Sequence, residues 1–432
     1  MRRLVALAFA AVVVSASGVA HGNGRFPSTT SISFPRGPTQ DLYLGVTFGL
    51  LISKGDGGFR WLCEANIGYE GTWDPKYRID AAGTIYASTY DGLRISRDGG
   101  CTFTTAPDLG ALWIEGLDVA ANGDVWVATA EGAAANNVYR STDGGRTFTA
   151  TDNSSLQIWW KSVLTAQTDP QRVYIAGYQV SMVGDDAGTP APPVHLRRSD
   201  DGGATWIALP TDTITVGDSP ELHVEAVSPT DPDVVFVRSA RAQGADGDRV
   251  YRSADGGLTY TEVLSTTAAI RAVVARANGD VLVATLASGA FLSTDGGLTF
   301  NPLTAPPRAA CLGDRGDALF SCGANWQPDL FALGRSTDGA AWTKVFRFVE
   351  IAGPLQCAVG TIQHDVCEVS EWPRWQADFG IKPPIDAGVE PPTPTPGGCC
   401  SGGGALAGPA LALGAVTAAV LLRRRRRKSC CE

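Results

Sequence analysis

The side chains best suited to chemistry in this 432-residue chain are aromatic and charged residues that precede or begin short apolar runs. Such runs predict β-strands, and polar groups at strand starts can gather around one site. Tryptophan rings stack on sugar faces, and mixed charges bind polar partners. The competing interpretation is that these groups only satisfy one another. The residues we assign to a ligand site are Trp113, Glu115, Trp159, Trp160, Lys161, His223 and Arg271.

Motifs of the common hydrolases and nucleotide enzymes do not occur in the sequence. It contains no H-E-x-x-H, G-x-S-x-G or phosphate-binding G-x-x-x-x-G-K-[ST] motif, no dinucleotide fingerprint and no EF-hand loop. The four histidines are scattered and no Cys-x-x-Cys pair occurs, so neither a metal ion nor another cofactor is expected. We therefore assign no catalytic residue.

One eight-residue turn, here named the DGG turn, recurs along the chain and is clearest at Ser141–Phe148 (STDGGRTF). Its serine returns every 40 to 58 residues, in the range of four-stranded propeller blades. The aspartate accepts bonds from nearby amides, the glycines allow positive φ, and the aromatic residue anchors the next strand. The serines and aspartates of the seven copies are Ser53 and Asp56, Ser96 and Asp98, Ser141 and Asp143, Ser199 and Asp201, Ser253 and Asp255, Ser293 and Asp295, and Ser336 and Asp338.

Apolar runs at a fixed distance before each DGG turn are the elements that must position the candidate site. The runs at 41–46, 123–127 and 279–283 are examples, and we assign each as the second strand of a blade. Seven copies predict an all-β fold, a single seven-bladed β-propeller of four-stranded blades over residues 24–378. In such a ring the starts of the innermost strands surround a central channel, where we expect the ligand site.

The pattern S-x-D-x-G-x-T-[FWY] at this period resembles the Asp-box, or BNR, repeat of sialidase-like propellers. The resemblance implies that each turn joins the third and fourth strands at the outer edge of a blade. Sialidases, xyloglucanases, sortilin-type receptors and photosystem II assembly factors carry this repeat, so the resemblance implies fold more strongly than activity. It leaves open a glycoside hydrolase, sialidase-like or xyloglucanase-like, that uses carboxylates at the channel. Arg25-Phe26-Pro27 is similar to the Arg-Ile-Pro motif of sialidases but lacks its isoleucine.

Ten cysteines in a chain with an export signal favour disulfide bonds. We predict Cys63–Cys101 between the edge of blade one and the turn of blade two. We also predict Cys311–Cys322 on successive strands of blade seven, and Cys357–Cys367 closing a loop after the last blade.

Both ends of the chain have the composition of targeting segments. Residues 1–20 combine two arginines, an apolar run and small residues, as in a secretory signal peptide. Residues 379–398 form a proline-rich linker before a tail at 399–432. Within the tail, the uncharged run 405–422 is long enough to span a bilayer, and the basic cluster 423–428 follows it.

This tail resembles the MYXO-CTERM sorting signal of myxobacteria. The resemblance implies recognition by a sorting protease in the membrane, processing near Cys399 and Cys400, and delivery to the cell surface. Between the two ends, 27 basic and 43 acidic residues give a net charge of −16, which disfavours nucleic acid as a partner. We expect an exported, monomeric, surface-anchored propeller that binds a protein or glycan without catalysis.

Overall fold

The computed structural model describes residues 25–382 except 38, 56–57, 72, 181–192, 217–219, 241–246, 287–288 and 305. The predicted signal peptide and sorting tail lie outside these residues. No helix in the part of the chain that the structure describes has the length and apolar character of a membrane span.

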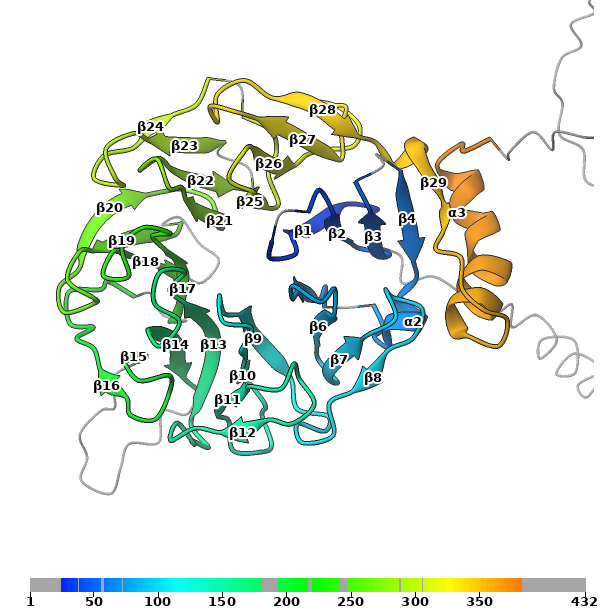
Figure 1. Cartoon of the computed structure of the whole chain (residues 1–432). Coiled ribbons are helices and arrows are strands. Elements are labelled where there is room, and N and C mark those ends of the chain that lie inside the picture. Colours follow the sequence, from blue (N-terminus) through cyan, green and yellow to red (C-terminus); the bar gives the residue numbers. More distant parts are fainter. Residues whose placement is uncertain are drawn as a thin grey trace, which may run out of the picture. The chain divides into compact units, whose positions relative to one another are not determined.

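The predicted seven-bladed propeller is confirmed: the described residues form seven sheets arranged around a central axis, and the four strands of each blade are antiparallel (Figure 1). Blade one comprises β1 (Thr29–Ser33), β2 (Leu42–Val46), β3 (Gly49–Ser53) and β4 (Phe59–Leu62), and blade two comprises β5 (Lys76–Ile79), β6 (Ile85–Thr89), β7 (Gly92–Ser96) and β8 (Thr104–Thr105). Blade three comprises β9 (Ile114–Val119), β10 (Val125–Thr129), β11 (Val138–Ser141) and β12 (Thr149–Ala150), and blade four comprises β13 (Ile158–Thr165), β14 (Val173–Gln179), β15 (Val194–Ser199) and β16 (Ile207–Ala208).

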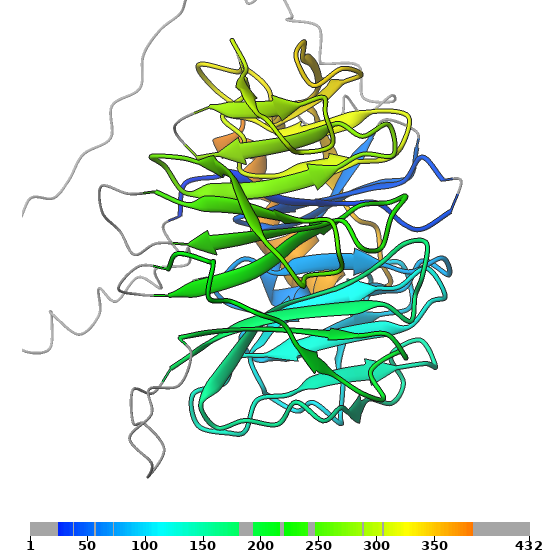
Figure 2. The same ribbon diagram turned by 90° about the vertical axis from the view of Figure 1, so that its left-hand side faces the viewer.

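The remaining blades follow the same order, with the first strand innermost and the fourth at the rim (Figure 1). Blade five comprises β17 (Glu221–Val227), β18 (Val235–Ala240), β19 (Arg249–Ser253) and β20 (Thr261–Ser265). Blade six comprises β21 (Ile270–Ala275), β22 (Val281–Thr285), β23 (Ala290–Ser293) and β24 (Asn301–Pro302). Blade seven comprises β25 (Leu312–Asp314), β26 (Leu319–Cys322), β27 (Leu333–Ser336) and β28 (Thr343–Phe346). Figure 2 shows the blades edge on.

The hydrophobic core of the propeller is a ring of blade interfaces. Alternate residues of a strand face opposite sides of its sheet, so each second strand contributes to two interfaces. In β6, Ile85 and Ala87 pack against blade one, whereas Tyr86 packs against blade three. The described residues contain seven such clusters, one between each pair of adjacent blades.

Each DGG turn joins the third and fourth strands of its blade and has the same internal hydrogen bonds in blades two to six. In blade two, the Ser96 hydroxyl donates to Asp98 and accepts from the backbone N–H of Gly100, at 2.8 and 2.9 Å. The backbone N–H and hydroxyl of Thr102 donate to Asp98, at 3.0 and 2.6 Å. In blade seven the backbone amides of Ala340 and Ala341 take the place of the threonine. The turn of blade one includes residues 56–57 and lies partly outside the described residues.

The DGG turns also join neighbouring blades. Arg140 on β11 donates to the carbonyl of Gly202 in the next turn at 2.8 Å, and Arg198 and Arg252 repeat this bond one and two blades further on. In blades three, four and six the second glycine faces an aromatic ring of the preceding blade; a Cβ at Gly203, for example, would lie 2.6 Å from Trp126. These turns therefore set the spacing between blades.

Closure of the ring differs from the repeat because blade one is built entirely from the N-terminal end of the described chain. After blade seven, a 3-10 turn η2 (Phe348–Glu350) leads into β29 (Ile351–Pro354), which pairs in parallel with β4 as a fifth strand. A π-helical segment η3 (Gln363–Glu371) and α3 (Trp372–Asp378) then lie outside β4 (Figure 1). A short helix, α2 (Glu64–Ile67), follows β4.

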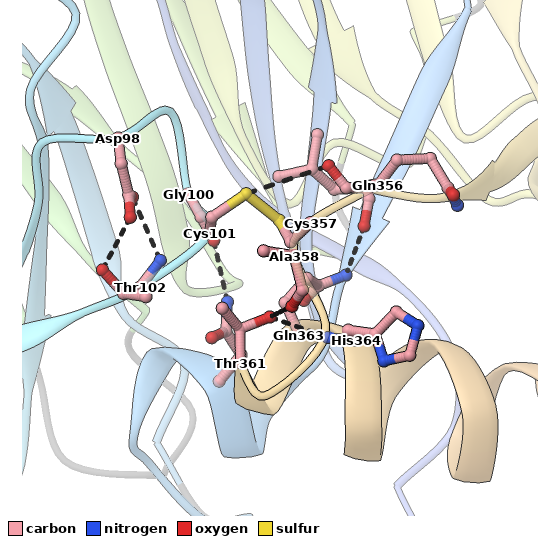
Figure 3. The surroundings of a disulfide bond; sticks show 12 residues. Asp98, Gly100, Cys101, Thr102, Gln356, Cys357, Ala358, Thr361, Gln363 and His364 are labelled. Atoms are coloured by element: carbon pink, nitrogen blue, oxygen red, sulfur yellow. Dashed lines mark hydrogen bonds between the residues drawn. A yellow bond between two sulfur atoms is a disulfide. The ribbon is translucent and has the colours of Figure 1, made fainter.

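Two disulfides attach this C-terminal segment to blades one and two, and they correct our predicted pairing. Cys63 bonds Cys367 and Cys101 bonds Cys357, so the predicted bonds Cys63–Cys101 and Cys357–Cys367 are wrong. Figure 3 shows Cys101 within the DGG turn of blade two, bonded to Cys357 of the facing loop. The loop returns to blade one because the Gln363 amide donates to the Trp61 carbonyl at 2.9 Å. The predicted Cys311–Cys322 bond is present.

Candidate functional site

The candidate site is a cavity of about 450 Å³ at the end of the central channel where the innermost strands begin. We name this end the mouth. Its lining includes the starts of β1, β5, β9 and β21, which belong to blades one, two, three and six. Convergence of strand starts was the basis of the sequence prediction, and the structure places Trp113, Glu115 and Arg271 on this lining.

An arc of aromatic rings crosses the mouth from blade two to blade four. The Trp113 ring centroid lies 4.9 Å from Trp73, 5.1 Å from Tyr90 and 5.4 Å from Trp159. Trp159 in turn lies 5.9 Å from Tyr178. Trp113 is 9% exposed, but Trp73 and Tyr90 are 50% and 55% exposed. Two rings at the open edge of the arc are therefore available to a ligand.

A buried charge network supports the arc. Lys161 lies 2.6 Å from Glu115 and 3.3 Å from Glu221, and its ammonium is 5.2 Å from the centre of the Trp113 ring. Lys76 lies 3.4 Å from the second Glu115 oxygen. Although burial acts in the opposite direction, Lys76 and Lys161 hold the pKa of Glu115 below its ordinary value. Glu115 is therefore an anion at neutral pH.

Arg271 differs from the other cations at the mouth. Its side chain is exposed on β21 and lines the cavity. Among the described residues it has no ion-pair partner, whereas Lys76 and Lys161 are both paired with carboxylates. Its five donor N–H groups can bind oxygen atoms of a ligand.

Four of the seven predicted site residues do not line the cavity. Trp159 and Lys161 contact Trp113 and Glu115, which do, and the other two are Trp160 and His223. Trp160 is fully buried between blades three and four, and its indole N–H donates to the Asn153 carbonyl at 2.9 Å. The prediction failed because side chains alternate along β13, so Trp159 and Trp160 face opposite ways. His223 is 9% exposed and does not line the cavity. Burial and the nearby Arg238 lower the pKa of His223, which keeps the ring neutral.

A second group of charges lies beside the mouth, at the start of the described chain. Arg25 bonds Asp74 at 2.6 Å and Glu64 at 2.7 Å, and Asp74 also lines the cavity. Burial raises the pKa of Glu64 to about 7, against the lowering effect of Arg25. Burial likewise raises the pKa of Asp74. The arginine of the Arg25-Phe26-Pro27 sequence is therefore already bound to two carboxylates.

Sequence reasoning missed several residues of the mouth. Trp73 and Tyr90 lie in loops of blade two, and Lys76 begins β5, where we expected only the start of a strand. A signal was available for Trp73, because it precedes the first strand of its blade as Trp113 does. No pattern indicated Tyr90, since turns between the second and third strands vary in length and composition.

Comparison with known proteins supports the fold and leaves the family open. No family model matches the chain. The dispase autolysis-inducing protein of Streptomyces mobaraensis is 29% identical over 246 residues, which amount to 44% of this chain and 59% of that protein. The chain therefore spans about three fifths of the length of this curated relative.

Solved structures with a similar fold are also propellers with low sequence identity. An ancestral GH74 enzyme has a TM-score of 0.54 at 15% identity, with 75% of this chain and 47% of that chain covered. YCF48 bound to D1 peptide has a TM-score of 0.46 at 13% identity, covering 68% of this chain and 90% of that chain. The GH74 enzyme of Niastella koreensis has a TM-score of 0.42 at 15% identity, covering 73% and 65%. The likeness to the ancestral GH74 enzyme, at 15% identity, shows a similar fold alone.

Proposed function

We propose that this protein is a non-catalytic binding module that is exported and held at the cell surface, and that it takes a protein or glycan ligand at the mouth. The observation that carries this proposal is the mouth itself. It combines exposed aromatic rings with a carboxylate, Glu115, that is paired with two lysines. Exposed rings bind ligands, whereas paired carboxylates are poor proton donors.

The carboxylates of the mouth decide between binding and hydrolysis. Glycoside hydrolysis requires one carboxyl group that donates a proton and a second that acts as base or nucleophile. Of the described residues that line the cavity, Asp74 and Glu115 carry carboxylates. Glu115 is bound by two lysines and has a lowered pKa, so it does not serve as a general acid. This arrangement favours a ligand that is held and left unchanged.

Several other features support the export and anchoring parts of the proposal. Three disulfides are typical of proteins that fold in an oxidising compartment. The DGG turns resemble Asp-box repeats, and the tail with Cys399 and Cys400 resembles a MYXO-CTERM signal. The similar protein from Streptomyces mobaraensis has a name that describes an effect on another protein, dispase. A protein ligand is therefore one form that the binding function takes in this proposal.

A glycoside hydrolase is the second candidate function, because two neighbouring carboxylates beside the mouth have raised pKa values. Glu64 and Asp74 share Arg25, and burial raises the pKa of both groups, that of Glu64 to about 7. A protonated carboxyl at neutral pH is what a general acid needs. Glu64 does not line the mouth cavity, however, which favours the binding function.

The test is to purify the protein with its C-terminal tail uncleaved and to assay it for turnover and for binding. Aryl-glycosides and a glycan array cover the hydrolase candidate, and unchanged ligand recovered after incubation supports the binding module. If turnover occurs and Glu64→Gln or Asp74→Asn abolishes it, the non-catalytic proposal is wrong. Glu350→Gln is the matched control, because Glu350 pairs with Lys344 at the rim of blade seven.

A further inference from the structure

The mouth continues into a second cavity over blade two. This outer cavity of about 580 Å³ is lined by α2 and the residues after it, including Ala65, Gly68 and Glu70. Trp73 and Tyr90 line both cavities, so the two meet at the most exposed rings of the aromatic arc. Together they form a groove, here named the mouth groove, that leads from the channel across the face of blade two.

Hydroxyl groups at the channel end of the groove lack partners. The side-chain oxygens of Thr29, Thr30 and Ser31 are buried, and they have no hydrogen-bond partner among the described residues. All three residues line the mouth. Buried hydroxyls are costly unless they are bonded, so groups in this position favour a ligand that supplies several donors and acceptors.

The charges of the groove disfavour an anionic ligand. Glu115 and Asp74 at the mouth have cationic partners, and the outer cavity adds two further carboxylates, Glu70 and Asp91. The propeller is acidic overall, which repels polyanions. Arg271 is exposed at the same end as the unpartnered hydroxyls, where its N–H groups can donate to neutral oxygen atoms.

We propose that the ligand of the mouth groove is an extended, uncharged oligosaccharide. The inference rests on the proposed binding function and names its ligand class. Sugar rings lie on Trp73 and Tyr90, which are about half exposed and line both cavities. Sugar hydroxyls bond the Thr29–Ser31 hydroxyls and Arg271 at the channel end. Because the groove spans two cavities, affinity increases with chain length until both are filled.

The experiment uses neutral hexose chains of two to six units on an array, followed by calorimetric titration of those that bind. We expect a six-unit chain to bind about tenfold more tightly than its two-unit counterpart, because only the longer chain reaches Trp73 and Tyr90 and fills both cavities. Trp73→Ala should remove most of this length dependence. Trp326→Ala is the matched control, because Trp326 is also exposed but lines neither cavity.

A second pair of variants tests the channel end of the groove. Arg271→Gln should weaken binding of every chain length by about the same factor, roughly fivefold, because the lost donor group contacts the end that all chains occupy. Arg308→Gln is the control, since Arg308 is exposed but does not line the cavity. Oligogalacturonate of six units, which carries negative charge, should bind more weakly than the neutral chains.

Three outcomes would overturn the inference: no neutral chain binds, affinity does not depend on length, or Trp73→Ala and Trp326→Ala have equal effects. Binding of a protein partner that Trp73→Ala weakens, with no sugar bound, overturns the inference but leaves the binding module intact. Cleavage of a chain that binds overturns the proposed function instead. The two failures are therefore distinguishable in the same set of measurements.

Discussion

The DGG turns and the mouth both concentrate polar side chains, but their partners come from different parts of the chain. In a DGG turn, Asp98 bonds Ser96 and Thr102, so its side-chain partners lie within four residues. At the mouth, Lys161 bonds Glu115, which is 46 residues away in the neighbouring blade. The hydrogen bonds of the turn therefore form between residues close in sequence, whereas those of the mouth form only when neighbouring blades pack together.

The two regions also differ in whether their polar side chains have hydrogen-bond or ion-pair partners. The DGG turns use the same bonds in blades two to six, where each aspartate accepts from the serine and threonine of its own turn. The mouth has three hydroxyls without partners and an arginine without an ion pair among the described residues. A repeated turn whose polar groups bond one another stabilises the fold, whereas polar groups without partners in the fold can bind a ligand. Changes at the rim should thus alter unfolding, and changes at the mouth should alter binding.

The largest expected effect at the rim comes from the disulfide that joins blade two to the C-terminal segment. Cys101→Ala with Cys357→Ala should lower the free energy of unfolding by about 4 kcal/mol, because the bond closes a loop of about 50 residues when Cys63–Cys367 remains. Urea denaturation measures the loss. Ligand binding at the mouth should not change.

The Cys311–Cys322 bond is the control, because its cysteines are only 11 residues apart. Replacing both with alanine should cost about 3 kcal/mol, since a shorter loop restricts the unfolded chain less. If the Cys101–Cys357 variant is the more stable of the two, the C-terminal segment does not fasten the ring.

Adjacent glycines in one DGG turn provide the next test. Both Gly296 and Gly297 have positive φ, at 77° and 82°, so alanine strains the backbone at either position. A Cβ at Gly297 would overlap the Phe236 ring of the preceding blade, whereas no described atom lies within 4 Å of a Cβ at Gly296. Gly296→Ala should cost about 1 kcal/mol and Gly297→Ala about 3 kcal/mol in thermal or urea unfolding. Equal losses would mean that the second glycine has no part in blade packing.

The same contrast explains what could be predicted from the sequence. The DGG turn is local, so its spacing identified the seven blades and their second strands, and its resemblance to the Asp-box implied the edge position of each turn. Strand starts also identified Trp113, Glu115 and Arg271 as neighbours at the mouth. Alternation along β13 was readable but was not applied, and Trp160 was therefore placed on the wrong side of its sheet.

Features that depend on ring closure could not be predicted in this way. Cys63, Cys101, Cys357 and Cys367 come together only because β29 pairs with β4 and the following helices return over blade one. Nothing in the local sequence distinguishes the three ways of pairing four cysteines that meet in space. The exposure of Trp73 and the missing partners of the β1 hydroxyls likewise depend on neighbouring blades.

The raised pKa of Glu64, which lies beside the mouth, predicts that stability depends on pH between about 5 and 7. Its pKa is raised to about 7 in the folded protein, mainly by burial, from an ordinary value of 4.5. The folded state therefore holds a proton that the unfolded state loses, and the associated stability is present below about pH 4.5 and is lost as the pH rises to 7. Glu64→Gln should reduce the fall in the free energy of unfolding between pH 5 and 7 by roughly 1–2 kcal/mol, a value that allows for solvent screening. Urea denaturation at each pH measures this fall. Glu350→Gln, at the rim, should leave that part of the profile unchanged.

The smallest effect is expected from a DGG-turn aspartate, and its sign is opposite. Hydrogen bonds from the Thr205 hydroxyl and backbone, and from Ser199, lower the pKa of Asp201 to about 2. Its contribution to stability is present above the ordinary value of 3.8 and is lost as the pH falls towards 2. Asp201→Asn should therefore reduce the drop in melting temperature between pH 4 and 2, because an amide accepts from the backbone at any pH. Asp212→Asn, an exposed aspartate outside the turns, is the control. If Asp201→Asn retains the full acid-side drop, as the control should, the turn aspartates do not stabilise the propeller through their charge.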